Sequence, residues 1–268
     1  MNLDDIRLKD LVDRNKLNRE NVFYAKGNSR VGVLLLHGLG FDAENLELLF
    51  KYLKLKRYTI RMPLIGGLSG FKGSRSSCEK DWLKELNVHL EKLSDEVDSV
   101  IIIGHSFGGN LGLSLAASQF KKIKAIITLE TPIFFKIKIK FFLITLQPLL
   151  EFFKVDLIKK NKFVYRSNYM GTKDIFPFLP VRIVGRIYKF IKFNTINNLK
   201  RIKVPYLIIQ AKTSDLISSR SAKYIFKKIK SNQKEIYYVD SNNHDFDLMD
   251  EEGKILILKK INKFIKYI

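Results

Sequence analysis

Short, continuous apolar runs alternate along this chain with longer stretches in which apolar residues recur every three or four positions. A short apolar run that ends at glycine, proline or a polar cluster is typical of a strand buried on both faces. On this basis six strands are predicted, and residues 22–24 could form a seventh. The six span residues 31–36, 58–62, 99–103, 123–129, 206–210 and 235–239.

The stretches between these runs predict helices. The clearest covers residues 79–97, and its apolar face carries Trp82, Leu86 and Leu90. Further helices are predicted at 43–55, 110–117, 218–229 and 253–268. Strands that alternate with helices imply an α/β fold, in which helices cover both faces of a mostly parallel central sheet. Ligands bind beyond the carboxyl ends of such strands, so the residues that follow each strand are the first candidates for chemistry.

The alternation breaks off between Pro132 and Lys203. This segment holds 16 Lys and Arg residues against three acidic residues. It is also rich in phenylalanine: Phe134, Phe135, Phe141, Phe142, Phe152 and Phe153. The insertion predicts a cap over the site, with its apolar side toward the substrate and its lysines toward solvent. Residues 136–140 alternate like a strand and 143–153 look helical, so the internal structure of the cap stays open. The predicted organisation is a core in two parts, 1–131 and 204–268, with the cap 132–203 between them.

The net charge is +21 over 268 residues. A surface this basic could meet nucleic acid, an anionic membrane or an acidic substrate. Lysine, isoleucine and asparagine are abundant throughout the chain, which favours a general compositional bias as the origin of the charge. The sequence carries no RNA-recognition signature, zinc-finger spacing or basic helix-turn-helix, so no nucleic-acid partner is predicted. The basic cap leaves peripheral contact with anionic lipid open.

Cysteine usage and hydropathy bear on the compartment. Cys78 is the only cysteine, which is typical of a protein of the reducing cytoplasm. The first residues lack the pattern of a signal peptide, and no segment approaches the length of about 18 apolar residues that a transmembrane helix needs. We therefore expect a cytoplasmic protein. Its oligomeric state is not predicted.

The most specific motif is Gly104-His105-Ser106-Phe107-Gly108, which directly follows an apolar run. A buried strand that ends in G-x-S-x-G and leads into a helix is the pattern of a nucleophile elbow. The turn is tight enough to require glycine on both sides, and it holds the serine hydroxyl clear of the sheet. The pattern predicts Ser106 as a nucleophile.

A serine hydroxyl needs a base to remove its proton, and the chain has only four histidines. His89 lies away from the apolar face of its predicted helix and is expected in solvent. His37 follows the first long strand, and His105 adjoins the nucleophile at a turn where neighbouring side chains diverge. His244 follows the last predicted strand, where the base of a serine hydrolase on a parallel sheet belongs. It is the predicted base.

The base in turn needs a carboxylate to fix its tautomer. Asp215 follows the strand 206–210 and is the preferred acid, although an aspartate before a helix can also be a cap. Glu130 stands at the end of the preceding strand and is the alternative.

The oxyanion of a tetrahedral intermediate requires two backbone N–H donors. Phe107, which follows the nucleophile, should supply one, and Leu39 in the loop His37-Gly38-Leu39-Gly40 should supply the other. His37, Gly38 and His105 are predicted to border the substrate. No metal and no cofactor are predicted.

These motifs together resemble the α/β-hydrolases, and more narrowly the small bacterial carboxylesterases and monoacylglycerol lipases. The resemblance runs from about residue 22 to the C-terminus, and its matching stretches are 33–38, 104–109, 127–132, 204–211 and 241–244. It implies an α/β-hydrolase fold with a small cap, no cofactor, a triad of Ser106, Asp215 and His244, and oxyanion donors at Leu39 and Phe107.

The chain departs from the family pattern at two places. Where many relatives have a P-x-x-x-G-H-G loop after the second strand, this chain has leucine at 68 and serine at 69. Where many have glycine before the catalytic histidine, it has Asn243. Both changes concern the shape of the acyl pocket and leave the triad intact.

The sequence thus predicts a carboxylic ester hydrolase that forms an acyl-enzyme on Ser106, with an ester of an apolar acyl group as substrate. A thioesterase or a carbon–carbon bond hydrolase would use the same triad. The alternative from another class is a protein that binds lipid or membrane surfaces on a hydrolase scaffold.

Overall fold

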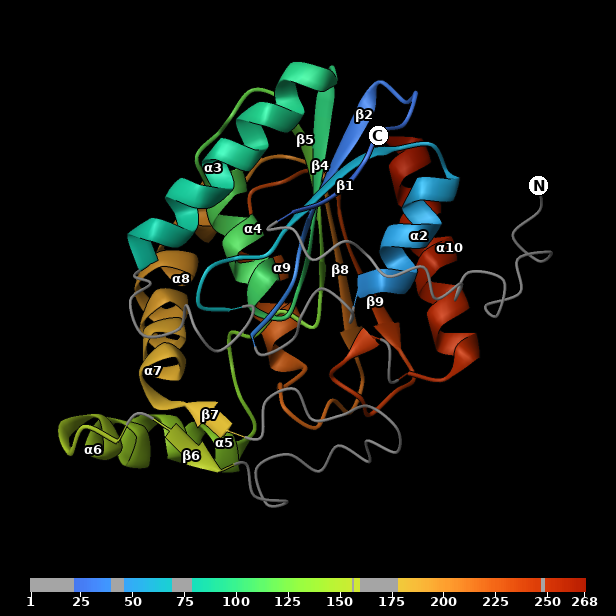
Figure 1. Ribbon diagram of the computed structural model, residues 1–268. Coiled ribbons are helices and arrows are strands. Elements are labelled where there is room, and N and C mark those ends of the chain that lie inside the picture. The colour runs from blue at the N-terminus through green and yellow to red at the C-terminus, as the bar shows by residue number, and fades with distance from the viewer. Residues whose placement is uncertain (1–21, 40–45, 69–78, 156, 160–177, 247–248) are drawn as a thin grey trace.

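A seven-stranded sheet runs through the middle of the molecule, with helices on both of its faces (Figure 1). The computed structural model describes residues 22–39, 46–68, 79–155, 157–159, 178–246 and 249–268. The strand order is β1-β3-β2-β4-β5-β8-β9. The strands are β1 (Val22–Ala25), β2 (Val31–Leu36), β3 (Thr59–Pro63), β4 (Ser99–His105), β5 (Ile123–Leu129), β8 (Tyr206–Ala211) and β9 (Lys234–Val239).

All neighbouring strands are parallel except β1, which pairs antiparallel with β3 at the edge. This confirms the mostly parallel sheet, and the possible strand at 22–24 is present as β1. The strands β2, β4 and β5 are almost wholly buried because helices cover both sides of the sheet. Their apolar runs therefore carry no polar alternation.

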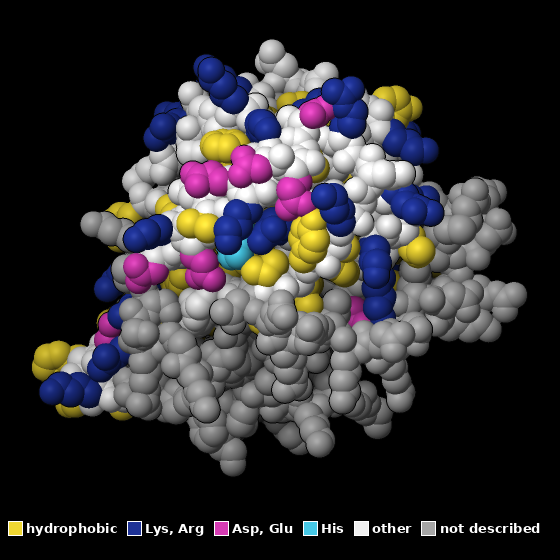
Figure 2. Space-filling view, turned by 45° about the horizontal axis from the view of Figure 1, so that its top comes forward, with side chains coloured by type: hydrophobic (Ala, Val, Ile, Leu, Met, Phe, Trp, Pro, Cys, Tyr) yellow, Lys and Arg dark blue, Asp and Glu magenta, His cyan; other side chains and the backbone are white. Residues whose placement is uncertain are grey.

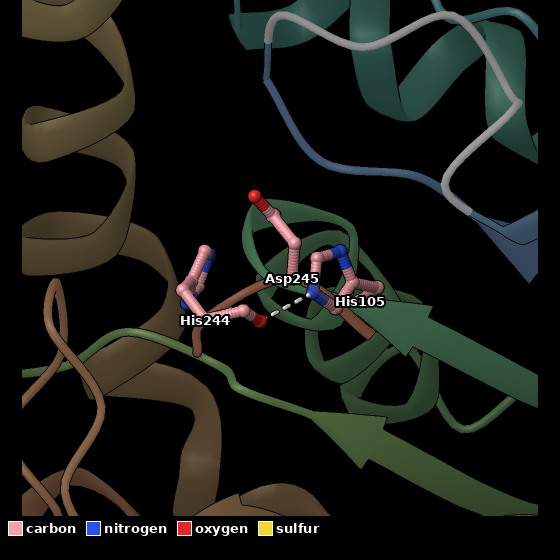
Figure 3. A group of neighbouring side chains, drawn as sticks. All are labelled: His105, His244 and Asp245. Carbon is pink, nitrogen blue, oxygen red and sulfur yellow. Dashed lines mark hydrogen bonds between the residues drawn. The ribbon is translucent and has the colours of Figure 1, made fainter. Parts of the chain in front are cut away.

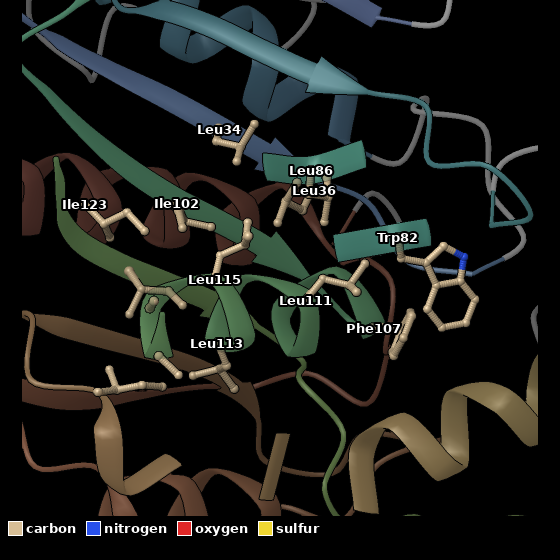
Figure 4. Packing of buried hydrophobic residues seen from close by; sticks show 14 of the residues in the cluster. Leu34, Leu36, Trp82, Leu86, Ile102, Phe107, Leu111, Leu113, Leu115 and Ile123 are labelled. Carbon is tan, nitrogen blue, oxygen red and sulfur yellow. The ribbon is translucent and has the colours of Figure 1, made fainter. Parts of the chain in front are cut away.

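Two layers of helices enclose the sheet. One face is covered by α2 and α10, and the other by α3, α4 and α9 (Figure 1). These helices are α2 (Glu47–Leu55), α3 (Glu79–Glu96), α4 (Phe107–Ala117), α9 (Arg220–Lys228) and α10 (Glu251–Tyr267). The central helix α4 is buried along nearly its whole length. Figure 4 shows Leu111 and Leu115 of α4 close to Ile102 of β4 and to the leucines of β2.

The chain between β5 and β8 is hereafter the 132–203 segment, and its described residues lie partly beyond the carboxyl ends of the central strands and partly beside α4 (Figure 1). Its elements are α5 (Ile137–Phe141), the π-helical turn η3 (Phe142–Leu146), α6 (Gln147–Phe152), β6 (Leu157–Lys159), β7 (Phe178–Pro180), α7 (Val181–Phe190), the π-helical turn η4 (Ile191–Thr195), α8 (Ile196–Asn198) and the short helix η5 (Leu199–Arg201). β6 and β7 form an antiparallel pair. α7 and η4 add buried apolar side chains to the core around α4.

The sequence left open whether residues 136–140 form a strand and whether residues 143–153 form a helix, and the structure answers both questions. Residues 137–141 form a helix, although the alternation at 136–140 is strand-like. The region 143–153 is helical, as expected, up to Phe152.

Some expectations lie outside the described residues: the start of the helix at 43–55, Gly40, Ser69 and Cys78. Among the described helices, none is both long and apolar enough to cross a membrane.

Candidate active site

The junction of β4 and α4 forms a strained elbow at Ser106. This residue has φ 54° and ψ −126°, a backbone conformation that residues other than glycine seldom adopt. Steric crowding by the backbone explains why glycine occupies positions 104 and 108. A Cβ atom at Gly108 would lie 2.3 Å from the carbonyl oxygen of Leu36, and one at Gly104 would lie 2.5 Å from the carbonyl oxygen of Gly108. The elbow predicted from the sequence is therefore present.

Ser106 meets His244 directly, although 138 positions separate them in the chain. The serine Oγ lies 2.8 Å from His244 Nε2, which is a normal length for a hydrogen bond. His244 sits in the loop after β9 and is buried. A neutral imidazole that accepts this hydrogen bond at Nε2 must carry its proton on Nδ1. The pair is thus poised for transfer of the serine proton to the ring.

Two carboxylates were predicted for the acid position, and the structure places them differently. Oε2 of Glu130 lies 3.5 Å from His244 Nδ1, and both side chains are buried. Asp215 is exposed, and within the described part of the chain it forms no ion pair with His244. Its backbone N–H donates to the carbonyl of Asn242 at 3.0 Å. Glu130 therefore faces the ring, whereas the preferred acid is exposed and reaches the ring only as the weakest of its neighbouring charges.

The charges around His244 raise its pKa. Burial of the ring opposes its protonation, but interaction with Glu130 and the negative charge of Asp245 outweigh that effect. Asp215 contributes the weakest of these electrostatic influences. His244 is accordingly a stronger base than an ordinary histidine.

His105 contacts the backbone of His244. Its ring is buried, and its Nε2 lies 3.0 Å from the backbone carbonyl of His244, to which it donates (Figure 3). Burial and the neighbouring His244 lower the pKa of His105 to about 3, so the ring stays neutral. His105 also lines the pocket, as predicted, yet its polar contact is with the protein.

His105, His244 and Asp245 are the one group of described residues whose ligand atoms could hold a metal, all within 4.8 Å of one another (Figure 3). Nε2 of His244 is hydrogen-bonded to Ser106, and its Nδ1 faces Glu130 at 3.5 Å. Nε2 of His105 is held by the carbonyl of His244. The arrangement therefore suits proton transfer at Ser106 better than metal ligation.

His37 has a structural place that the sequence did not indicate. It is fully buried, its Nε2 accepts from the backbone N–H of Ile65 at 3.1 Å, and its Nδ1 lies 2.8 Å from the carbonyl of Gly38. The ring thus ties the loop after β2 to the loop after β3. It lies outside the pocket lining, contrary to the expectation that it borders the substrate.

Leu39 and Phe107, the predicted oxyanion donors, both line the pocket beside Ser106. Phe107 begins α4, so its N–H is one of those that a helix leaves without an intrahelical partner. Its ring packs edge-on against Trp82, with the ring centroids 5.2 Å apart (Figure 4), and against Phe190 at 5.3 Å. Such aromatic pairs each contribute about 0.5–1.5 kcal/mol beyond area burial, so Phe107 is firmly fixed.

The pocket above Ser106 is mainly apolar and has a volume of about 800 Å³, part of which is open to solvent. The 132–203 segment supplies much of the wall through Phe135, Ile139, Phe142, Leu143, Val184, Ile187 and Tyr188. Phe141, Phe152 and Phe153 are instead exposed, so only part of the apolar side of the segment faces the site. Tyr188 and Asp245 also line the pocket. No sequence motif pointed to Tyr188 or to Asp245.

An elbow serine that is hydrogen-bonded to a histidine at the carboxyl edge of a mostly parallel sheet defines the class: the protein is an α/β-hydrolase. The model of the family described as serine aminopeptidase, S33, matches residues 27–252, and the chain belongs to this family.

Relatives agree with this assignment. A carboxylesterase of Bacillus subtilis (strain 168) is 24% identical over 260 residues, which cover 91% of this chain and 95% of the relative. A solved structure from work on LipS and LipT, two metagenome-derived lipolytic enzymes, superposes with a TM-score of 0.78 at 21% identity and covers 94% of this chain and 99% of that one. The monoacylglycerol lipase of Paleococcus ferrophilus gives a TM-score of 0.76 at 16% identity, with 93% of this chain and all of that chain (100%) covered.

Proposed function

We propose that this protein hydrolyses carboxylic esters through an acyl-enzyme on Ser106. The observation that carries the proposal is the 2.8 Å hydrogen bond between Ser106 and His244 at a strained elbow that opens into an apolar pocket. The carboxylesterase of Bacillus subtilis and the lipolytic enzymes of similar fold support the same reaction class.

In the proposed reaction, Ser106 Oγ attacks the ester carbonyl while His244 Nε2 takes the hydroxyl proton. The oxyanion is bound by the N–H groups of Leu39 and Phe107, and each such donor is worth about 3 kcal/mol of barrier. His244 then gives its proton to the departing alcohol, which leaves the acyl group on Ser106. Water activated by the same ring releases the acid and restores the serine.

The apolar wall of the pocket favours an ester whose acyl chain is apolar. The proposed substrate is an ester with an acyl chain of short to medium length or a monoacylglycerol, because the lining beside Ser106 is mainly apolar. A thioester would meet the same groups, and a C–C bond hydrolase would use the same triad. We infer that the reaction needs no cofactor, because every step uses groups of the chain itself.

A series of p-nitrophenyl esters from acetate to laurate tests this function, with matched acyl thioesters in parallel. Ser106→Ala should lower kcat by more than about 10³-fold, because the remaining groups cannot form the acyl-enzyme. Ser118→Ala is the control, since Ser118 lies at the far end of α4 and its hydroxyl donates to the carbonyl of Leu115. Hydrolysis that survives the loss of Ser106 would refute the nucleophile, and faster turnover of thioesters would change the substrate class.

We also propose that the 132–203 segment rests on anionic lipid. Along α5, η3 and α6, several large apolar side chains point into solvent, among them Phe141 (68% exposed), Phe152 (78%) and Phe153 (66%). Exposed lysines lie among them at 136, 138, 140 and 154. In Figure 2, hydrophobic and basic side chains mingle on the projection at lower left, where α6 lies in Figure 1. Aromatic anchors among lysines are the pattern of segments that lie in a lipid interface.

Flotation with phosphatidylcholine vesicles, with and without phosphatidylglycerol, tests the lipid surface. The triple substitution Phe141→Ser, Phe152→Ser and Phe153→Ser should abolish the anionic binding, and Tyr267→Ser on α10 should not. Tyr267 is a matched control because it is 77% exposed and belongs to another face. Equal binding by all three proteins would refute the role of α5 and α6. The cytoplasm remains the predicted compartment on the strength of a single cysteine.

A further inference from the structure

Glu130 occupies a costly position for a residue of its type. It follows β5 directly, its side chain is only 1% exposed, and its φ is 50°. A left-handed backbone is unfavourable for a residue other than glycine, and it persists where surrounding contacts enforce it. A charged side chain is rarely buried so completely without partners. The combination calls for a reason beyond packing.

The two oxygens of the Glu130 carboxylate have different surroundings. Oε1 accepts hydrogen bonds from the backbone N–H of Ala211 and from Nε2 of Gln210, the latter at 2.8 Å. Oε2 is held by no such donor among the described residues, and it faces His244 Nδ1 at 3.5 Å. That nitrogen is likewise buried and without a hydrogen bond in the described part of the chain. Strand β8 therefore clamps one oxygen and leaves the other directed at the histidine.

We propose that Glu130 at the end of β5, and not Asp215 after β8, is the carboxylate that orients His244. This inference rests on the proposed esterase function for its catalytic consequence. Glu130 is a positioning residue, because it touches the base and not the substrate. The 3.5 Å separation between Oε2 and Nδ1 is about 0.5 Å longer than an ordinary hydrogen bond. Catalytic hydrogen bonds are often long in the free enzyme and shorten in the reacting complex.

The chemistry follows from the tautomer of the ring. A carboxylate at Nδ1 keeps the proton there, so the lone pair of Nε2 points at Ser106. When Nε2 takes the serine proton, the ring becomes a cation beside the negative Oε2. The carboxylate stays ionised throughout, and the proton passes from Ser106 Oγ to Nε2 and then to the leaving alcohol. The other groups that act on His244 are His105, Asp245 and, most weakly, Asp215.

Substitution of each candidate acid distinguishes the two assignments. Glu130→Gln keeps the shape but offers an amide that donates to Nδ1, which forces the wrong tautomer. It should lower kcat by about 10³–10⁴-fold with little change in KM, and Glu130→Asp should restore part of the loss. Asp215→Asn is the matched control and should stay within about threefold of the wild type, because it is exposed. A severe loss in Asp215→Asn with a mild one in Glu130→Gln would overturn the proposal.

A second readout does not depend on ester turnover. The pKa of His244, followed by NMR of protein labelled in its histidine rings, should fall clearly in Glu130→Gln and much less in Asp215→Asn, whose charge acts most weakly on the ring. The rate at which a fluorophosphonate labels Ser106 should likewise fall more in Glu130→Gln than in Asp215→Asn. These results would stand even if the wild type hydrolysed no ester, so failure of the function is separable from failure of this assignment. An unchanged His244 pKa in Glu130→Gln and Glu130→Asp, with both variants folded by circular dichroism, would refute it.

Discussion

Two histidines in contact carry opposite pKa shifts at this site. The rings of His105 and His244 lie 5.2 Å apart, and both are buried. His105 donates to a carbonyl, and burial together with the neighbouring His244 lowers its pKa. His244 faces Glu130 and Asp245, so the acids prevail. Only one of the two can therefore accept a proton near neutral pH, and it is the one that touches Ser106.

The raised pKa of His244 predicts the pH dependence of the reaction. The ring must be neutral to accept the serine proton, so kcat/KM should fall as the pH drops through its pKa. The midpoint of this acid limb should lie above pH 6.5, the ordinary value for histidine. His105 cannot produce it, because its pKa is about 3.

Initial rates on one p-nitrophenyl ester across the pH range measure this limb. His89→Gln serves as the control, since His89 lies on α3 away from the site and its pKa is lowered to about 4. That variant should keep the wild-type midpoint. A midpoint below pH 6.5 in the wild type would mean that Glu130 and Asp245 do not act on the ring as their positions require.

At this scale the sequence could single out Ser106 and His244 but not the contacts that surround them. Ser106 followed from a motif, and His244 followed from elimination among four histidines. The choice of acid depended on which way a side chain turns after its strand. The positive φ of Glu130 sets the direction of its side chain, and a glutamate in the sequence does not indicate a positive φ. His89 was expected in solvent and is half-buried for a similar reason, since helix periodicity says little about neighbouring elements.

At the scale of elements, the site depends on how closely β2, β4 and α4 approach one another. Gly108 marks the closest point, because α4 starts against the last carbonyl groups of β2. A Cβ atom there would lie 2.3 Å from the oxygen of Leu36 and 2.5 Å from that of His37. Both contacts are with backbone, which cannot rotate away as a side chain would. The strand and the helix must separate if the atom is added.

Gly108→Ala should therefore destabilise the protein by about 3 kcal/mol and displace the oxyanion loop from Ser106. The matched change is Gly66→Ala, whose new atom would meet only Oε2 of Glu85 at an ordinary 3.6 Å. It should cost less than about 1 kcal/mol. Urea unfolding followed by circular dichroism gives both values if the slope m is unchanged. Equal stability of the two variants would contradict the close approach.

The elements were predictable where burial is complete. The limits of β2 and β5 coincide with their apolar runs, because both faces of each strand are covered. In α5 the alternation of isoleucine and lysine over residues 137–140 suggested a strand. This stretch spans little more than one helical turn, and its lysines and isoleucines are mostly exposed. Because it has no buried face, its apolar residues need not follow the spacing of a helix.

For the whole molecule, the imbalance of charge is the dominant electrostatic fact. The chain has 48 basic and 27 acidic residues. Some acids are committed to pairs such as Lys51 with Glu47 and Arg61 with Glu96. Lysines and arginines are spread over the visible face in Figure 2. A surplus of this size destabilises the folded state, because its basic side chains repel one another. It also attracts anionic surfaces, over a distance that the salt concentration sets through screening.

Added salt should consequently stabilise the protein. The screening length falls from about 30 Å at 0.01 M to about 8 Å at 0.15 M, which removes most repulsion between exposed charges. A gain of 1 kcal/mol corresponds to a rise in Tm of about 2–4 °C for a chain of this size, so we expect a rise of a few degrees in NaCl. KCl should give the same rise, because screening depends on ionic strength and not on the cation.

The control is a variant with less surplus charge, Lys138→Glu with Lys140→Glu, both at exposed positions of α5. Its Tm should respond less to salt and should be higher at low ionic strength, because four units of net charge are removed where basic residues are concentrated. The same variant should bind anionic vesicles more weakly, since each basic residue near such a surface contributes about 1 kcal/mol. Self-repulsion and lipid attraction would then share one origin. A Tm that is unaffected by salt in both proteins would show that the surplus charges lie too far apart to act on stability.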